Sequence, residues 1–264
     1  MNKIYFVDID GTILDCNNGL IKPSKKTYEA FDKIKANGDM VFIASGRAKC
    51  LLPEEILKLN PSGYILANGA YCEYNNQILF ENVMDNNTKC NIIEFTDKYN
   101  GAYYLVSDDY IYTKDLKMPL HIEYSSSWFM VDCYKDQGYN DKISINIAMV
   151  AFEKDNQALV DIYEELSEFV DINHHGDYYS FDLNIKNVNK GSAITKLIKL
   201  LNINYEDTYA FGDGINDIEM MQSVKHSIAM GNAQKELKEV SKEETDTVLN
   251  DGLYKYLINN HLIS

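Results

Sequence analysis

Two carboxylates placed directly after a buried strand constrain this 264-residue chain more than any other feature of its sequence. The apolar run Ile4–Val7 is typical of a buried β-strand, and it is followed by the segment DIDGT at residues 8–12. Open α/β sheets place their functional loops at the carboxyl ends of their strands. We therefore expect Asp8 and Asp10 to lie in such a loop, with Gly11 providing a tight backbone turn.

Three further apolar runs, at residues 40–44, 64–67 and 209–211, also stop at small or polar residues. They are followed by Ser45-Gly46, by Asn68-Gly69 and by the segment GDGIND at 212–217. Helical patterns lie between the runs, because apolar residues recur at every third or fourth position after Ser24 and after Lys190. Alternation of strands and helices predicts an α/β fold with a parallel sheet, whose functional loops gather at one edge.

These motifs resemble those of the haloacid dehalogenase-like phosphatases, and within them the Cof-type hydrolases with a large cap between the second and third motifs. DIDGT is similar to the first family motif, Ser45 in IASGR to the second, Lys190 in NKGS to the third and GDGIND to the fourth. The flanking segments ANGA (67–70), AMGNA (229–233) and NDGL (250–253) are also similar to this subfamily. The resemblance spans nearly the whole chain, and it implies a Rossmann-like parallel-sheet core with an inserted cap domain.

The middle of the chain predicts an inserted α+β domain. Its helices are expected over 86–98 and 159–166, its strands over 103–106, 110–112 and 143–150, and a hairpin over 170–174 and 178–185 around Gly176-Asp177. Strand counting and the resemblance together predict three segments. These are a first part of the core over 1–82, the cap over 83–182 and a second part of the core over 183–264.

The carboxylates Asp8, Asp213 and Asp217 would converge at the edge of such a sheet. Two carboxylates about 4 Å apart repel by roughly 4 kcal/mol at an effective dielectric constant near 20, so a divalent cation is expected between them. Mg²⁺ suits all-oxygen ligation better than zinc, which favours His and Cys. The resemblance implies that Asp8, the backbone carbonyl of Asp10 and Asp213 hold the metal, while Asp217 binds it directly or through water.

The resemblance also implies roles in catalysis. Asp8 would attack phosphorus to form an aspartyl-phosphate, while Asp10 would protonate the leaving group and then activate water. A third set of residues would bind the phosphoryl oxygens: Thr12, Ser45 with Gly46, Lys190 and Asn216.

The resulting expectation is a Mg²⁺-dependent phosphomonoester hydrolase acting on small phosphorylated metabolites such as sugar phosphates or cofactor phosphates. A phosphomutase of the same superfamily stays open, because the core motifs do not exclude it. A non-catalytic protein that binds phosphorylated ligands is disfavoured, because every catalytic position is filled. Neither the physiological substrate nor the oligomeric state, monomer or dimer, follows from the sequence.

Negative charge is concentrated on the insert. Residues 83–182 contain 19 Asp and Glu against 7 Lys and Arg, a net charge of −12, whereas the other residues contain 21 against 18, a net of −3. This balance disfavours nucleic acid, polyphosphate and anionic membranes as partners. Two interpretations stay open: the charge disfavours highly anionic substrates, or it only keeps the protein soluble.

The compartment is predicted from two weaker features. The N-terminal apolar run is too short for a signal peptide, and no segment approaches the length of a membrane span. The five cysteines are scattered and odd in number, without a CxxC pair, which favours reduced thiols. We therefore expect a cytoplasmic protein.

Overall fold

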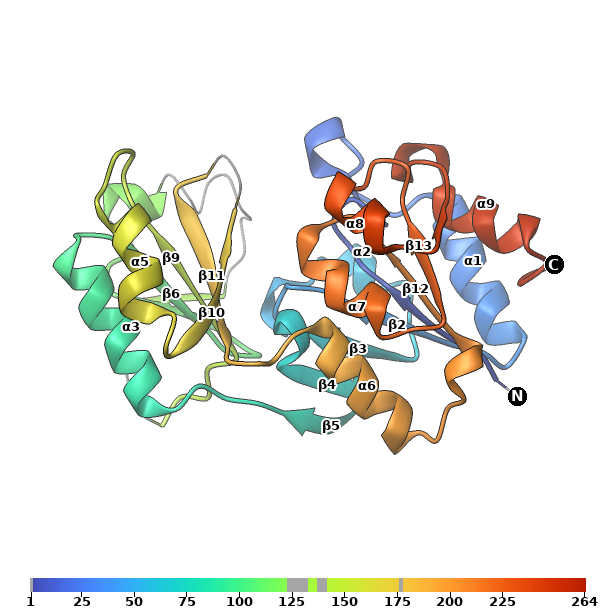
Figure 1. Cartoon of the computed structure of the whole chain (residues 1–264), viewed down its shortest axis with the longest axis horizontal. Coiled ribbons are helices and arrows are strands. Elements are labelled where there is room, and N and C mark those ends of the chain that lie inside the picture. Colours follow the sequence, from blue (N-terminus) through green and yellow to red (C-terminus); the bar gives the residue numbers. More distant parts are fainter. Residues whose placement is uncertain (1, 123–132, 137–141, 176–177) are drawn as a thin grey trace. The chain divides into compact units, whose positions relative to one another are not determined.

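The computed structural model describes residues 2–122, 133–136, 142–175 and 178–264, and these form two compact units (Figure 1). The first unit comprises Met1–Gly46, Leu52–Phe80 and Asn189–Ser264, and the second comprises Arg47–Leu51 and Glu81–Val188. The chain thus leaves the first unit and later returns to it, which is the connectivity of an inserted domain. Among the described residues, no helix combines the length and the apolarity needed to cross a membrane.

The first unit is built on an eight-stranded sheet. Its strands, in spatial order, are β14 (Glu243–Glu244), β13 (His226–Ala229), β12 (Thr208–Gly212), β1 (Ile4–Val7), β2 (Met40–Ala44), β3 (Gly63–Leu66), β4 (Tyr71–Tyr74) and β5 (Gln77–Glu81). The strands from β14 to β3 pair in parallel, and β4 pairs antiparallel with β3. The predicted parallel α/β sheet is therefore confirmed. Val7 aligns with Phe211 of β12 and with Ile43 of β2, so these three strands end at the same edge.

Helices cover both faces of this sheet, as Figure 1 shows. Tyr5 and Val7 contribute to the apolar core on one face, and Ile4 and Phe6 to the core on the other, which is the two-residue alternation of a strand. The first face packs against α1 (Lys25–Ala36), α2 (Glu54–Leu57) and α9 (Gly252–Asn259), and the second against α6 (Lys190–Leu200), α7 (Ile218–Gln222) and α8 (Lys235–Val240). Burial on both faces explains why β1 is apolar along its whole length.

Short 3₁₀ turns occupy several of the connections. They are η1 (Cys16–Asn18), η2 (Lys49–Leu51), η3 (Ala67–Gly69), η4 (Tyr205–Asp207), η5 (Ile215–Asp217) and η6 (Val248–Asn250). The turn η3 directly follows β3, and the turn η5 lies in the loop after β12. Both are at the edge of the sheet where the predicted site residues lie.

The second unit contains a six-stranded sheet, one face of which packs against two helices. The strands, in spatial order, are β10 (Val170–His174), β11 (Ser180–Ile185), β9 (Ile147–Ala151), β6 (Ala102–Val106), β7 (Ile111–Thr113) and β8 (Tyr134–Asp136), and the helices are α3 (Asn86–Lys98) and α5 (Ala158–Leu166). An apolar core that includes Phe95, Ile162 and Leu183 joins the two layers. The predicted hairpin is confirmed by the antiparallel pairing of β10 with β11, and its turn at Gly176-Asp177 lies outside the described residues.

One strand of the second unit is shorter than predicted. The expected strand over residues 143–150 begins only at Ile147. Before that point, the side chain of Asn146 donates hydrogen bonds of 2.9 Å to Oε1 of Glu81 and to the backbone oxygen of Asn82. The preceding residues therefore contact the segment that enters the unit, which the apolar pattern alone does not reveal.

Candidate active site

The predicted site residues lie on loops at the carboxyl edge of the sheet in the first unit. The loops follow β1 (Asp8, Asp10 and Thr12), β2 (Ser45 and Gly46) and β12 (Asp213, Asn216 and Asp217), and Lys190 is the first residue of α6. Because β12, β1 and β2 are adjacent and parallel, their ends bring three of these segments together.

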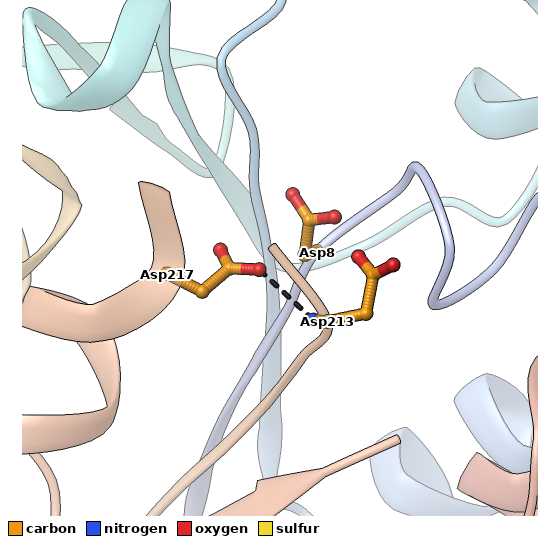
Figure 2. Close-up of side chains that lie close together, drawn as sticks. All are labelled: Asp8, Asp213 and Asp217. Carbon is orange, nitrogen blue, oxygen red and sulfur yellow. Dashed lines mark hydrogen bonds between the residues drawn. The ribbon is translucent and has the colours of Figure 1, made fainter. Parts of the chain in front are cut away.

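Three carboxylates form the centre of the site. Asp8, Asp213 and Asp217 each offer a carboxylate oxygen, and these oxygens all lie within 4.8 Å of one another. Figure 2 shows Asp8 at the end of β1 beside the two aspartates of the loop after β12. Asp8 and Asp217 are buried and Asp213 is partly buried, so the three groups share an environment with little water. Asp10, in contrast, is exposed to solvent.

Lys190 is the cation that partners this cluster. Its ammonium donates hydrogen bonds of 2.7 Å to Oδ1 of Asp8 and 2.6 Å to Oδ1 of Asp217, and its side chain is completely buried. The first turn of α6 is held in place by a capping box, in which Asn189 and Ser192 exchange hydrogen bonds between side chain and backbone. The helix start therefore fixes the point from which the lysine side chain extends.

Asp217 shapes the loop that carries Asp213. Its Oδ2 accepts hydrogen bonds from the backbone amides of Asp213 at 3.0 Å, drawn in Figure 2, and of Gly214 at 3.1 Å. Its Oδ1 accepts the hydrogen bond from Lys190. Since both oxygens already accept hydrogen bonds, Asp217 acts as a structural centre of the loop as well as a member of the acidic cluster.

Burial and mutual repulsion perturb the acids. Burial, followed by the charge of Asp217, holds the pKa of Asp8 well above its ordinary value, although Lys190 opposes this shift. Burial and the charge of Asp217 likewise raise the pKa of Asp213 to about 7. For Lys190, burial alone would lower the pKa of the ammonium, but the attraction of Asp217 and Asp8 outweighs burial and raises it.

These groups fit a divalent cation. Fully ionised, the three aspartates and Lys190 carry a net charge of −2. Burial, together with this excess of negative charge, raises the pKa values of Asp8 and Asp213. All of the clustered donor atoms are carboxylate oxygens, the ligand type that Mg²⁺ prefers. The donor set therefore agrees with the expected Mg²⁺ rather than with zinc.

Two contacts join the loop after β1 to the loop after β12. A Cβ atom placed on Gly11, whose φ is +79°, would lie 1.8 Å from Oδ2 of Asp213, so only glycine permits this approach. Asn232 donates hydrogen bonds from Nδ2 to the backbone oxygen of Gly11 at 2.8 Å and to Oδ2 of Asp213 at 3.4 Å. Gly11 and Asn232 therefore determine where the Asp213 carboxylate lies.

The predicted phosphate ligands Thr12, Ser45 and Asn216 lie in the loops after β1, β2 and β12. The hydroxyl of Thr12 is buried and has no hydrogen-bond partner within the described parts of the chain, so its hydrogen-bonding capacity is available to a ligand. Ser45 is buried directly after β2, and its backbone amide donates to the oxygen of Ile65 at 2.9 Å. Asn216 donates from Nδ2 to Oδ1 of Asn68 at 3.4 Å.

The sequence prediction assigned no role to Asn68 or Asn232, although both contact predicted site residues. The only signal was their position in the segments ANGA and AMGNA, which follow the apolar ends of strands. Polar residues at the carboxyl ends of parallel strands lie near the site by topology. That argument would have marked both residues as candidates, but not their partners.

Comparison with known proteins gives a consistent result. The family described as haloacid dehalogenase-like hydrolase matches residues 5–257. The chain is 29% identical over 254 residues, 96% of its own length and 95% of the other, to the Bacillus subtilis (strain 168) protein named "Putative phosphatase YkrA".

Two solved structures are also similar. A hypothetical protein of Geobacillus kaustophilus HTA426 superposes with a TM-score of 0.88 at 27% identity, with both chains covered completely. The subclass IIB sugar phosphatase BT4131 superposes with a TM-score of 0.85 at 22% identity, over 99% of this chain and 100% of the other. The second likeness concerns the fold alone.

Proposed function

Because this chain belongs to the haloacid dehalogenase-like hydrolases, we propose that it is a Mg²⁺-dependent phosphatase that hydrolyses small phosphorylated metabolites through an aspartyl-phosphate. The observation that carries the proposal is the pairing of Asp8 with Lys190 beside Asp213. This arrangement combines a carboxylate nucleophile, a buried positive charge and a cation site within one cluster. A protein that only binds phosphorylated ligands would have no need of a carboxylate nucleophile.

In the first step, a carboxylate oxygen of Asp8 attacks phosphorus while the bond from phosphorus to the ester oxygen breaks. Lys190 binds Oδ1 of Asp8 and so orients the carboxylate, because a buried side chain with two hydrogen bonds has little freedom to move. Asp10, exposed two residues further along, donates its proton to the departing alkoxide. The products of this step are the free alcohol and the aspartyl-phosphate.

In the second step, Asp10 accepts a proton from a water molecule, which attacks phosphorus and releases Asp8 with inorganic phosphate. The transferred group carries negative charge on its oxygens throughout, and it needs preoriented donors. Thr12, Ser45 and the side-chain amide of Asn216 supply these donors. Gly46, which has no side chain, lets the backbone of the loop after β2 approach the phosphoryl group closely. The hydroxyl of Thr12, which has no hydrogen-bond partner among the described residues, supports this assignment.

The cation site is assigned to Asp8, the backbone carbonyl of Asp10 and Asp213. A Mg²⁺ ion bound there would neutralise charge on the phosphoryl oxygens. Asp217 is assigned an indirect contribution to this site, because its two oxygens hold Lys190 and the loop amides.

We assign recognition of the leaving group to the inserted unit, a cap spanning approximately residues 83–182 between core segments 1–82 and 183–264. The groups at the sheet edge account for the phosphoryl group only, so the remainder of the substrate needs a second surface. The net charge of −12 over residues 83–182 favours substrates with a neutral leaving group, such as sugar monophosphates, over bisphosphates and nucleoside triphosphates.

The test is release of inorganic phosphate by the purified protein from p-nitrophenyl phosphate and from a panel of phosphorylated metabolites. We expect hydrolysis that requires Mg²⁺, stops in excess chelator and is absent from Asp8→Asn. Absence of phosphate release from every substrate, or full activity in excess chelator, would contradict the proposal. Isomerisation that depends on a bisphosphate and releases no phosphate would identify a phosphomutase instead.

A further inference from the structure

The turn η3 has a left-handed backbone at three consecutive residues, one of which is an alanine. Ala67, Asn68 and Gly69 have consecutive φ values of +49°, +48° and +99°. Such values are unstrained for glycine and tolerated by asparagine, but a left-handed alanine is uncommon. Conformations of this kind persist only where the surrounding structure holds them, and they concentrate at functional sites.

Asn68 connects two of the loops to which phosphate binding is assigned. Its backbone amide donates a hydrogen bond of 3.2 Å to the oxygen of Ser45, in the loop after β2. Its side-chain Oδ1 accepts a hydrogen bond of 3.4 Å from Nδ2 of Asn216, in the loop after β12. Asn68 is buried, with only 4% of the residue exposed, so these contacts are not exchanged freely for water.

Two glycines allow the same turn to approach its neighbours closely. A Cβ atom on Gly69 would lie 2.3 Å from the backbone oxygen of Asn189, the N-cap of the helix that begins with Lys190. A Cβ atom on Gly46 would lie 3.0 Å from Oδ1 of Asn68. The turn therefore touches the loop after β2, the loop after β12 and the start of α6.

We infer that Asn68 is a positioning residue: its amide oxygen holds the side chain of Asn216 so that Asn216 donates to the phosphoryl group. The inference rests on the proposed phosphatase function and extends it to a residue that does not itself react. Because the turn is left-handed, the side-chain amide of Asn68 reaches Asn216 while the backbone amide of Asn68 donates to the oxygen of Ser45. An unstrained turn at this place would direct the Asn68 side chain elsewhere.

The first experiment removes the side chain and keeps the backbone. Asn68→Gly tolerates the left-handed conformation. Asn60→Gly is the matched control, because Asn60 has the same φ of +48° but is exposed in the segment after α2. Both variants gain the same flexibility in the unfolded chain. We expect Asn68→Gly to lower kcat/KM by about tenfold or more, and Asn60→Gly to retain wild-type kinetics.

A double-mutant cycle tests whether Asn68 acts through Asn216. If it does, Asn68→Gly added to Asn216→Ala should change kcat/KM by less than about twofold, although it has a large effect on its own. A merely structural role predicts independent effects that multiply. Multiplicative effects in this cycle would overturn the inference.

Binding of inorganic phosphate in the presence of Mg²⁺, measured by calorimetry, separates this inference from the proposed function. We expect Asn68→Gly to weaken phosphate binding by about tenfold while Asn60→Gly does not. That result would uphold the positioning role even in a protein that hydrolysed none of the substrates tested. Equal phosphate affinity of wild type and Asn68→Gly would overturn it, whatever the catalytic activity of the wild type.

Discussion

Lys190 and Asp8 are 182 residues apart in the chain, yet Nζ of the lysine lies 2.7 Å from Oδ1 of the aspartate, and both side chains are buried. A second hydrogen bond ties the same ammonium to Asp217. The pairing compensates charge that would otherwise be costly in an interior. It also makes the lysine and the proposed nucleophile a single unit, on which most of the following predictions depend.

Replacing Lys190 should impair both activity and stability. Lys190→Met leaves Asp8 and Asp217 buried without their cation, a change that typically costs about 3–5 kcal/mol of unfolding free energy. We expect kcat/KM to fall by about 10²-fold or more, with a loss of stability that grows as the pH rises. Lys199→Met on the exposed side of the same helix is the control and should leave both unchanged. Activity within tenfold of wild type would show that the lysine has no part in the chemistry.

Asp8→Asn should abolish turnover without unfolding the protein. The change is nearly isosteric and removes both the nucleophile and one cation ligand, so we expect kcat to fall by about 10²-fold or more. Asp32→Asn, at an aspartate whose side chain is 77% exposed on α1, serves as the control. Circular dichroism would verify the fold of each variant. Retention of more than about a tenth of the wild-type rate would rule out the aspartyl-phosphate route.

The stability of the metal-free protein should decrease as the pH rises. Folding raises the pKa of Asp213 from 3.8 to about 7, so its ionisation within this range destabilises the folded state. Asp8 contributes in the same direction. In chelator, Tm should therefore fall between about pH 4 and about pH 7, and Mg²⁺ should reduce the fall because it favours the ionised carboxylates.

Asp213→Asn provides the matched comparison for this titration. The variant keeps the volume of the side chain and removes the charge, so its Tm in chelator near pH 8 should exceed that of wild type by about 5 °C. Mg²⁺ should no longer stabilise it. A wild-type Tm that rises with pH over this range, or equal responses of both proteins to Mg²⁺, would contradict the assignment of Asp213 as a cation ligand.

Gly11 and Gly19 offer a controlled test of the contact with Asp213. Their φ values are +79° and +81°, so alanine introduces similar backbone strain at both, of about 1 kcal/mol. Only at Gly11 would the new Cβ atom meet Asp213, since nothing lies within 4 Å of a Cβ at Gly19. We expect Gly11→Ala to raise the Mg²⁺ concentration for half-maximal activity by about tenfold or more, and Gly19→Ala to leave it unchanged. A matching response in the two variants would mean that the contact does not control the site.

Local features of the sequence were sufficient to predict the elements that carry the site. The apolar run Ile4–Val7 predicted a buried strand. The run is apolar throughout because helices cover both faces of β1. Ser24 was expected to begin a helix, and its Oγ accepts a hydrogen bond from the amide of Thr27 at 3.1 Å. Periodicity and capping depend on neighbours within a few residues, so they can be recognised without a fold.

The convergence of the loops also followed from the sequence, although indirectly. Parallel strands that each end in polar residues bring those residues to one edge, and this holds for the ends of β1, β2 and β12. Strand topology predicts which loops lie near one another. It does not specify atoms.

Atomic pairings were decided only by the tertiary structure. The bonds of Asp217 to Lys190 and to the backbone of Asp213, and those of Asn68 to Ser45 and Asn216, could not be derived from spacing. The sequence by itself determined which residue types reach the edge of the sheet and in what order. Which oxygen meets which donor depends on differences of about 1 Å, which result from the packing of helices and turns that are distant in sequence.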